Sequence, residues 1–131
     1  MITVDLARAL VAGGVLWDPR PGDRFTIDRP GVIGEVFWIS ELTIDVHTFQ
    51  GQPLLGFNGT TEWALDSVTL DSALWLPRED QLRELLGERL ESLLRSSSSW
   101  RVRLSENNSG ERDFVDQDVE CAYALALLSV L

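Results

Sequence analysis

The feature that most constrains the fold of this chain is its apolar end, residues 121–131, in which only Ser129 is polar. Asp116 and Asp118 precede this run, and aspartate is a good helix N-cap, so the sequence predicts a final helix that starts after one of them. A span of 11 residues is far shorter than the ~20 that an apolar helix needs to cross a bilayer. A helix that is apolar on every side must therefore be covered on every side inside a protein.

Two arrangements can provide this cover, and the residue pattern leaves both open. In the first, the first and second helices of the same chain flank the last helix while a sheet covers its remaining side. In the second, the helix pairs with its own copy across a two-fold axis. We expect a homodimer or small homo-oligomer, whose interface would contain the side of the helix that carries Cys121, Leu125, Leu128 and Leu131.

Length and composition indicate one folded domain that spans residues 1–131. Hydrophobic residues make up 44% and charged residues 24% of the chain, which is typical of globular proteins. The single cysteine, Cys121, excludes an intramolecular disulfide. The first 14 residues lack the basic segment of a secretory signal, so we expect a cytoplasmic protein that does not contact a membrane.

Helical patterns occur in three places. The first covers about residues 3–12. The clearest begins at Pro77, and its leucines between Leu82 and Leu94 cover one half of the helical wheel. The serine tract at 96–99 is typical of the end of this second helix. The third helix is the apolar one at the end of the chain.

Strands are predicted between these helices. In the segment 100–104, Arg101 and Arg103 alternate with apolar residues, as in a strand with one buried face. The pair Asn58-Gly59 is a strong signal for a hairpin turn. The predicted strands include residues 24–27, 35–40, 42–49, 54–57, 60–63, 100–104 and 112–115. Their hairpin-type spacing predicts the α+β class, with an antiparallel sheet of about five to seven short strands and three helices packed on it.

The charge of the chain excludes several functions. It has 21 acidic residues against 11 basic ones, a net charge of −10, and every basic residue is an arginine. Nucleic-acid binding depends on clustered lysine and arginine, and a P-loop requires a lysine. The acids concentrate in residues 30–77 and 105–120. This pattern favours a solvated acidic surface, and the alternative is a docking surface for a basic partner.

The only histidine, His47, defines the one candidate metal site. It lies two residues from Asp45 on a predicted strand, so the two side chains share a face. Glu62, Glu35 and Glu41 can extend the set from adjoining segments, and carboxylates with one imidazole suit Mg²⁺ or Mn²⁺. Because strand alternation alone produces this spacing, Asp45, His47 and Glu62 are weak metal candidates. The sequence contains no G-x-S-x-G or G-x-G-x-x-G motif and indicates no catalytic residue.

One resemblance covers about half of the chain. The segment WLPREDQLRELL at residues 75–86 resembles a family of short bacterial and phage-borne hypothetical proteins with a W-L-P-x-x-x-Q-L helix. Residues 56–68 are similar to its actinobacterial members, and residues 120–128 resemble its closing helix. Members are sometimes labelled pilus assembly protein. The resemblance implies a helix-and-core pattern without catalytic motifs, and the absence of lysine excludes the ATPase activity that the label suggests.

These observations predict a non-catalytic protein-interaction or accessory module that needs no cofactor. Its expected partners are a second copy of the chain or another protein, not nucleic acid. The alternative is a small-ligand or divalent-metal-dependent enzyme that uses the acidic strand face around Asp45, His47 and Glu62.

Overall fold

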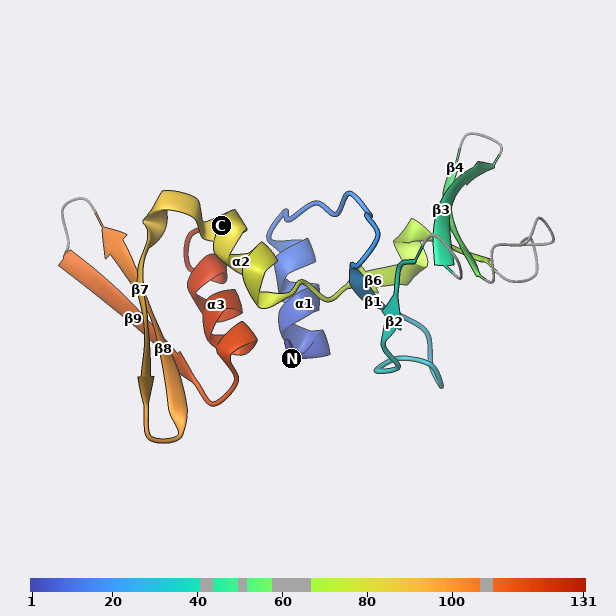
Figure 1. Cartoon of the computed structure of the whole chain (residues 1–131). Helices are drawn as coiled ribbons and strands as arrows, with labels where there is room; N and C mark the ends of the chain where they lie inside the picture. The colour runs from blue at the N-terminus through green and yellow to red at the C-terminus, as the bar shows by residue number, and fades with distance from the viewer. Residues whose placement is uncertain (41–43, 50–51, 58–66, 107–109) are drawn as a thin grey trace. The chain divides into compact units, whose positions relative to one another are not determined.

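The computed structural model in Figure 1 confirms the α+β class, with three α-helices and short antiparallel strands in the described part of the chain. The structure describes residues 1–40, 44–49, 52–57, 67–106 and 110–131. The chain divides into two compact units. Residues 1–16 and 77–131 form unit 1, and residues 17–76 form unit 2. The single domain expected from the sequence stays a prediction.

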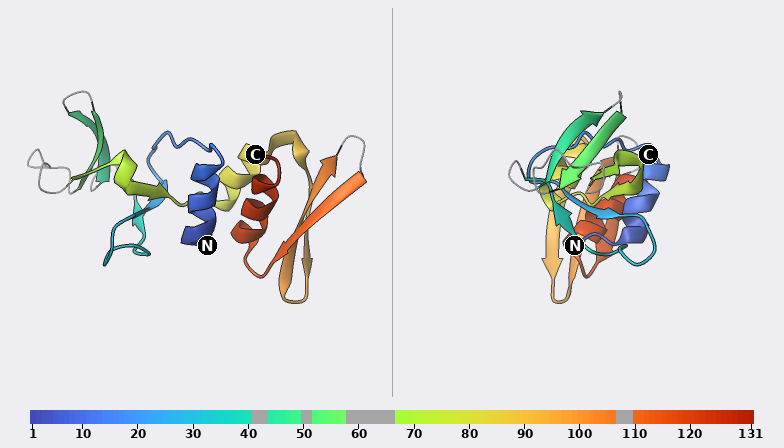
Figure 2. Two further views of the ribbon diagram at one scale, coloured as in Figure 1. Left: turned by 180° about the vertical axis from the view of Figure 1, so that it is seen from behind. Right: turned by 90° about the vertical axis from the view of Figure 1, so that its right-hand side faces the viewer.

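Unit 1 consists of a helical layer on one sheet. The sheet has the antiparallel order β7-β8-β9. Helix α3 packs on β8 and β9, and α1 and α2 pack on α3 (Figures 1 and 2). Its elements are α1 (Val4–Ala12), α2 (Glu79–Leu86), β7 (Leu90–Ser96), β8 (Ser99–Glu106), β9 (Gly110–Asp116) and α3 (Val119–Leu128).

Helix α3 is covered from both sides inside unit 1. Ala122, Ala124 and Ala126 are fully buried, and Tyr123 is 1% exposed. Small side chains allow the sheet and the flanking helices to approach the α3 backbone closely. The unit therefore uses the first of the two arrangements that the sequence left open, in which α1 and α2 flank the last helix.

The second helix is shorter than the sequence predicts. The prediction that it continues to Leu94 is wrong, because α2 ends at Leu86 and a 3₁₀ turn, Gly87–Arg89, leads into β7. Gly87 has φ +59° and ψ −133°, a backbone conformation that residues with a Cβ rarely adopt. The helix is therefore terminated at this glycine.

The leucines after Gly87 belong to a strand. Leu93 pairs with Val102 and Leu94 pairs with Arg101 across the β7–β8 hairpin. This pairing overrides the helical spacing of the leucines, because tertiary contacts routinely outweigh local propensity. The serine tract is not the end of a helix, as the sequence suggested, but the turn of this hairpin, which the Ser96–Ser99 pair closes.

The described part of unit 2 forms two small antiparallel sheets. One has the order β2-β1-β6 and the other has the order β3-β4-β5. The sequence predicts a single sheet, but the described strands are divided among three-stranded sheets. Hairpin spacing indicates which strands are antiparallel, but it does not indicate how many strands share a sheet. The Asn58-Gly59 hairpin lies outside the described residues. The elements are β1 (Arg24–Ile27), β2 (Phe37–Trp38), β3 (Ile44–Phe49), β4 (Gln52–Phe57), β5 (Ser67–Thr69), a 3₁₀ turn (Leu70–Ser72) and β6 (Ala73–Trp75).

Strand β1 forms the centre of the first of these sheets. Phe25 is fully buried in a cluster with Ile27 and Ile39. Asp23, just before the strand, is 3% exposed. Its carboxylate accepts hydrogen bonds from Trp17 Nε1 at 2.9 Å and from the Arg20 N–H at 3.0 Å. This buried carboxylate therefore serves to hold the preceding loop against the sheet.

Candidate functional site

The face of the β7–β8–β9 sheet that points away from α3 is the candidate site, and we call it the outer face. Because side chains alternate along β8, burial of Val102 and Leu104 against the helices places Arg101 and Arg103 on the outer face. Figure 1 shows no element on this face among the described residues of unit 1. Its charged and aliphatic side chains are Glu91 and Leu94 from β7, Arg101 and Arg103 from β8, and Glu111, Asp113 and Val115 from β9.

A network of ion pairs crosses the outer face. Asp113 accepts a hydrogen bond from Arg101 Nη1 at 2.9 Å and one from Arg103 Nε at 2.9 Å. Arg103 Nε also lies 3.2 Å from Glu111 Oε2. Partial loss of water raises the pKa of Glu91, and the Glu111 carboxylate close to it raises this pKa further. The face therefore presents both signs of charge, with arginines on the central strand and carboxylates on the flanking strands.

The titration of Asp113 tests this network. Hydrogen bonds from Arg103 and then Arg101 lower the pKa of Asp113 to about 2, so its ion pairs are present at neutral pH and lost as the pH falls toward that value. Replacing Arg103 by glutamine removes the larger cause and should move the midpoint toward 3.8, the ordinary value. Carbon NMR of the Asp113 carboxyl measures the midpoint directly.

The matched control for this titration is Arg112→Gln. Arg112 bonds Glu106 through Nη1 at 2.9 Å, so its loss should leave the Asp113 midpoint in place. An unchanged midpoint in Arg103→Gln would contradict the network.

Two exposed aliphatic side chains flank Arg101 in one row across the sheet. Leu94 pairs with Arg101, and Arg101 pairs with Val115. Leu94 is 41% exposed and Val115 is 45% exposed. Single exposed apolar residues are normal on protein surfaces, but this row places two of them beside an arginine, a residue type that protein interfaces favour.

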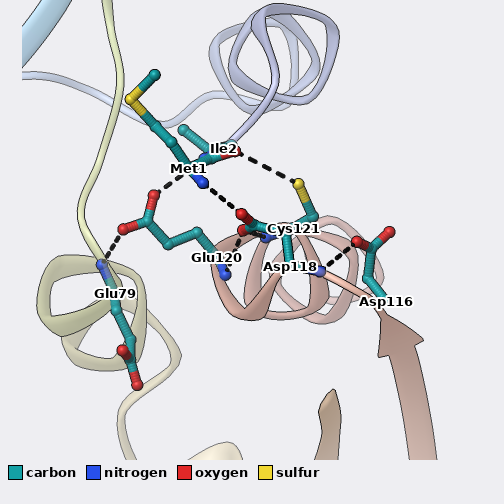
Figure 3. Close-up of polar contacts among 7 residues, drawn as sticks. All are labelled: Met1, Ile2, Glu79, Asp116, Asp118, Glu120 and Cys121. Carbon is teal, nitrogen blue, oxygen red and sulfur yellow. Dashed lines mark hydrogen bonds and ion pairs between the residues drawn. The ribbon is translucent and has the colours of Figure 1, made fainter. Parts of the chain in front are cut away.

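A second polar cluster, drawn in Figure 3, connects the three helices of unit 1, and we call it the helix junction. The carboxylate of Glu120 accepts a hydrogen bond from the Ile2 N–H at 2.9 Å and one from the Glu79 N–H at 3.2 Å. Glu120 lies in the first turn of α3, Ile2 precedes α1, and Glu79 begins α2. One side chain thus binds the beginnings of all three helices together.

Asp118 forms the other half of the helix junction. It caps α3 by accepting hydrogen bonds from the N–H groups of Glu120 at 2.9 Å and Cys121 at 3.1 Å, and it contacts the α-amino group of Met1. The hydrogen bond to Asp118 raises the pKa of this amino group. Partial burial opposes the charge on Asp118, but hydrogen bonds from Met1 and Cys121 outweigh burial and lower its pKa.

The pH dependence of the ion pair between Met1 and Asp118 follows from the directions of their two pKa shifts. Its stabilising effect is lost as the pH falls through the lowered pKa of Asp118, and again as the pH rises through the raised pKa of Met1. Since the oxygens of Asp118 and Glu120 accept hydrogen bonds from backbone N–H groups and the α-amino group, the junction has a structural role and does not present these acids to a ligand.

The predicted interface residues in and after α3 occupy different environments. Cys121 is 4% exposed, its thiol donates to the Met1 carbonyl oxygen at 3.8 Å, and burial raises the pKa of the thiol. Leu125 and Leu128 are half-buried, and Leu131 is 53% exposed. The side chain of Leu131 lies over Gly13, where an added Cβ would be 2.9 Å from Leu131 Cδ1. An interface through these residues stays a prediction.

The weak metal candidates fall largely outside the described part of the chain. Strand β3 includes Asp45 and His47, which pair with Gly56 and Leu54 of β4. The structure describes the backbone of Asp45 and His47 but not their side chains, and Glu62 and Glu41 lie outside the described residues. Among the residues that are described, no three His, Cys, Asp or Glu side chains are grouped as metal ligands require.

Sequence reasoning identified part of the outer face and missed the rest. The alternation in β8 placed Arg101 and Arg103 together on one side, as the structure confirms. The sequence predicts a helix at Leu94, and the structure places this residue on β7 beside Arg101. The glycine at position 87 was the signal that could have revealed the change from helix to strand.

Comparisons with protein-family models, with curated proteins and with solved structures find no match. The resemblance to short actinobacterial and phage-borne proteins therefore stays an expectation from the sequence. Within the described residues, no helix is both long enough and apolar enough to cross a membrane.

Proposed function

We propose that this chain is a non-catalytic protein-interaction module and that it binds through the outer face. The observation that carries the proposal is the exposed row Leu94–Arg101–Val115 on a sheet whose other face forms the core of unit 1. If a partner covered the two aliphatic side chains, the free energy of binding would gain about 25 cal/mol for each Å² of apolar surface removed from water. Arginine is also enriched among the residues that dominate binding at interfaces.

The acid at the centre of the outer-face network, Asp113, supports binding better than proton transfer. A general acid or base works best when its pKa lies near the working pH. Asp113 instead has a pKa of about 2, because Arg103 and Arg101 hold it in the charged form. At neutral pH this carboxylate therefore contributes a fixed charge to the surface.

Site-specific photo-crosslinking tests the proposal. Benzoylphenylalanine in place of Leu94, which is 41% exposed, should crosslink this chain to a partner protein in the cells that produce it. The same group in place of Leu85, which is 39% exposed on α2, provides the matched control and should not. Adding Val115→Asp should abolish the product from position 94. Equal products from both positions, or none from position 94, would contradict the proposed function.

A further inference from the structure

We infer that residues 17–76, unit 2, are an insertion that folds and unfolds independently of unit 1. The insertion lies between α1 and α2, so unit 1 is assembled from the two segments that flank it. Unit 1 and its outer face should therefore stay folded when unit 2 unfolds. This division goes beyond the proposed function, and it replaces the single domain predicted from the sequence with two domains.

The two ends of the insertion lie close together. Trp17, its first residue, donates a hydrogen bond from Nε1 to the Asp23 carboxylate at 2.9 Å. Leu76, its last residue, donates a hydrogen bond from its N–H to the carbonyl oxygen of Arg24, the residue next to Asp23, at 2.9 Å. The ring of Trp17 also stacks on the ring of Trp75, with their centroids 6.3 Å apart. Neighbouring ends are what allow one domain to be inserted into another.

Unit 2 has a hydrophobic core of its own. Phe25 is 0% exposed, and it packs with Ile27 and Ile39, which are 8% and 3% exposed. Trp17 and Phe37 pack against this cluster. All of these side chains belong to unit 2, and a domain that folds alone needs a core of this kind.

Contacts between its two segments close unit 1. The Ile2 N–H donates a hydrogen bond to the Glu120 carboxylate at 2.9 Å, although the two residues are 118 positions apart. After the other end of α1, Gly13 lies beneath the side chain of Leu131. Helix α1 also packs on α3. The segments on either side of the insertion are therefore joined directly to one another.

An unfolded insertion would oppose these contacts only weakly. The entropy lost when a flexible loop is closed rises with the logarithm of its length, so a long loop costs little more than a shorter one. The two segments gain in return the packing of α1 and α2 on α3 and of α3 on the sheet. Unit 1 can consequently form whether residues 17–76 are folded or unfolded.

Two spectroscopic signals follow the units separately. The described helices α1, α2 and α3 all lie in unit 1, so the helical circular dichroism signal reports on this unit. Four of the five tryptophans lie in unit 2, and the fifth is Trp100. In a Trp100→Phe background, tryptophan fluorescence therefore reports on unit 2 alone.

Urea denaturation of the full chain in this background tests the inference. Phe25→Ala, in the core of unit 2, should lower the midpoint of the fluorescence transition and leave the midpoint of the helical signal unchanged. Leu82→Ala, in the core of unit 1, should lower only the midpoint of the helical signal. If Phe25→Ala also lowers the midpoint of the helical signal, the chain unfolds as one unit and the inference is wrong.

Amide hydrogen exchange gives a second measurement at single residues. In Phe25→Ala the amide of Leu76, which donates to Arg24 in unit 2, should exchange at least ~100-fold faster, because the loss of a buried phenylalanine side chain is strongly destabilising. The amide of Ala122, which donates to the Asp118 carbonyl oxygen at 3.0 Å, should keep its exchange rate. Equal acceleration at both amides would contradict independent unfolding.

A milder variant covers the case in which Phe25→Ala leaves unit 2 unfolded without urea. Ile27→Val removes a single methylene from the same core, and it should lower the fluorescence midpoint while the midpoint of the helical signal stays in place. Equal shifts of both midpoints would show that one cooperative unit spans the chain, and this result would overturn the inference.

Discussion

Replacing Leu82 by alanine is expected to lower the free energy of unfolding by about 2–5 kcal/mol, the usual cost of removing a large buried aliphatic side chain. Leu82 is 0% exposed and Leu86 is 2% exposed, so these two leucines hold α2 in the core of unit 1. Helix α2 has 8 residues, and helices shorter than ~12 residues are marginal on their own. Packing therefore determines whether this helix forms.

Urea denaturation followed by circular dichroism measures this effect. Leu85→Ala provides the control on the same helix, because Leu85 is 39% exposed and its loss should cost less than about 1 kcal/mol. A similar loss of stability in both variants would show that α2 is not anchored through Leu82.

Replacing Glu120 by glutamine is expected to cost about 2 kcal/mol and to loosen the beginnings of α1 and α2 together. The carboxylate accepts hydrogen bonds from the Ile2 N–H and the Glu79 N–H, at 2.9 Å and 3.2 Å. Glutamine keeps one acceptor oxygen and turns an NH₂ group toward the other donor, which loses one charge-assisted bond and weakens the other.

Amide hydrogen exchange gives a direct readout of this junction. In Glu120→Gln the amides of Ile2 and Glu79 should exchange faster, and urea denaturation should show the loss of stability. The control is Glu84→Gln, an exposed position on α2, which should change stability by less than about 0.5 kcal/mol. Unchanged protection at both amides would contradict the role that the helix junction assigns to Glu120.

The sequence predicts a first helix from about residue 3 and narrows the start of the last helix to two aspartates, because capping is local. Thr3 accepts a hydrogen bond from the Leu6 N–H, and Asp118 accepts from the Glu120 and Cys121 N–H groups. Asp116 was the other candidate cap, and it instead accepts a hydrogen bond from the Asp118 N–H. The two candidate caps are two residues apart, and both are aspartates, so local preference does not distinguish them. Strand β9 extends to Asp116, and Asp118 is therefore the residue that caps the helix.

The candidate site could be predicted only in part. Alternation in β8 placed Arg101 and Arg103 on one side, since a strand has a period of two. The carboxylates and aliphatic side chains around them come from β7 and β9, and their positions depend on the register of two hairpins. The leucines from 90 to 94 match a helical period, so the glycine at position 87 is the only sign in the sequence that Leu94 could lie on a strand.

The sequence by itself determined the α+β class, the two terminal helices, the need to bury the last helix, and the distribution of charge. These properties depend on neighbours along the chain, on the period of apolar residues and on composition. The tertiary structure decided that α1 and α2 cover α3, that the chain turns from helix to strand at Gly87, and that mixed charges and two aliphatic side chains share the outer face. These outcomes depend on hydrogen bonds and packing between segments far apart in the chain, whose free energy exceeds local preference.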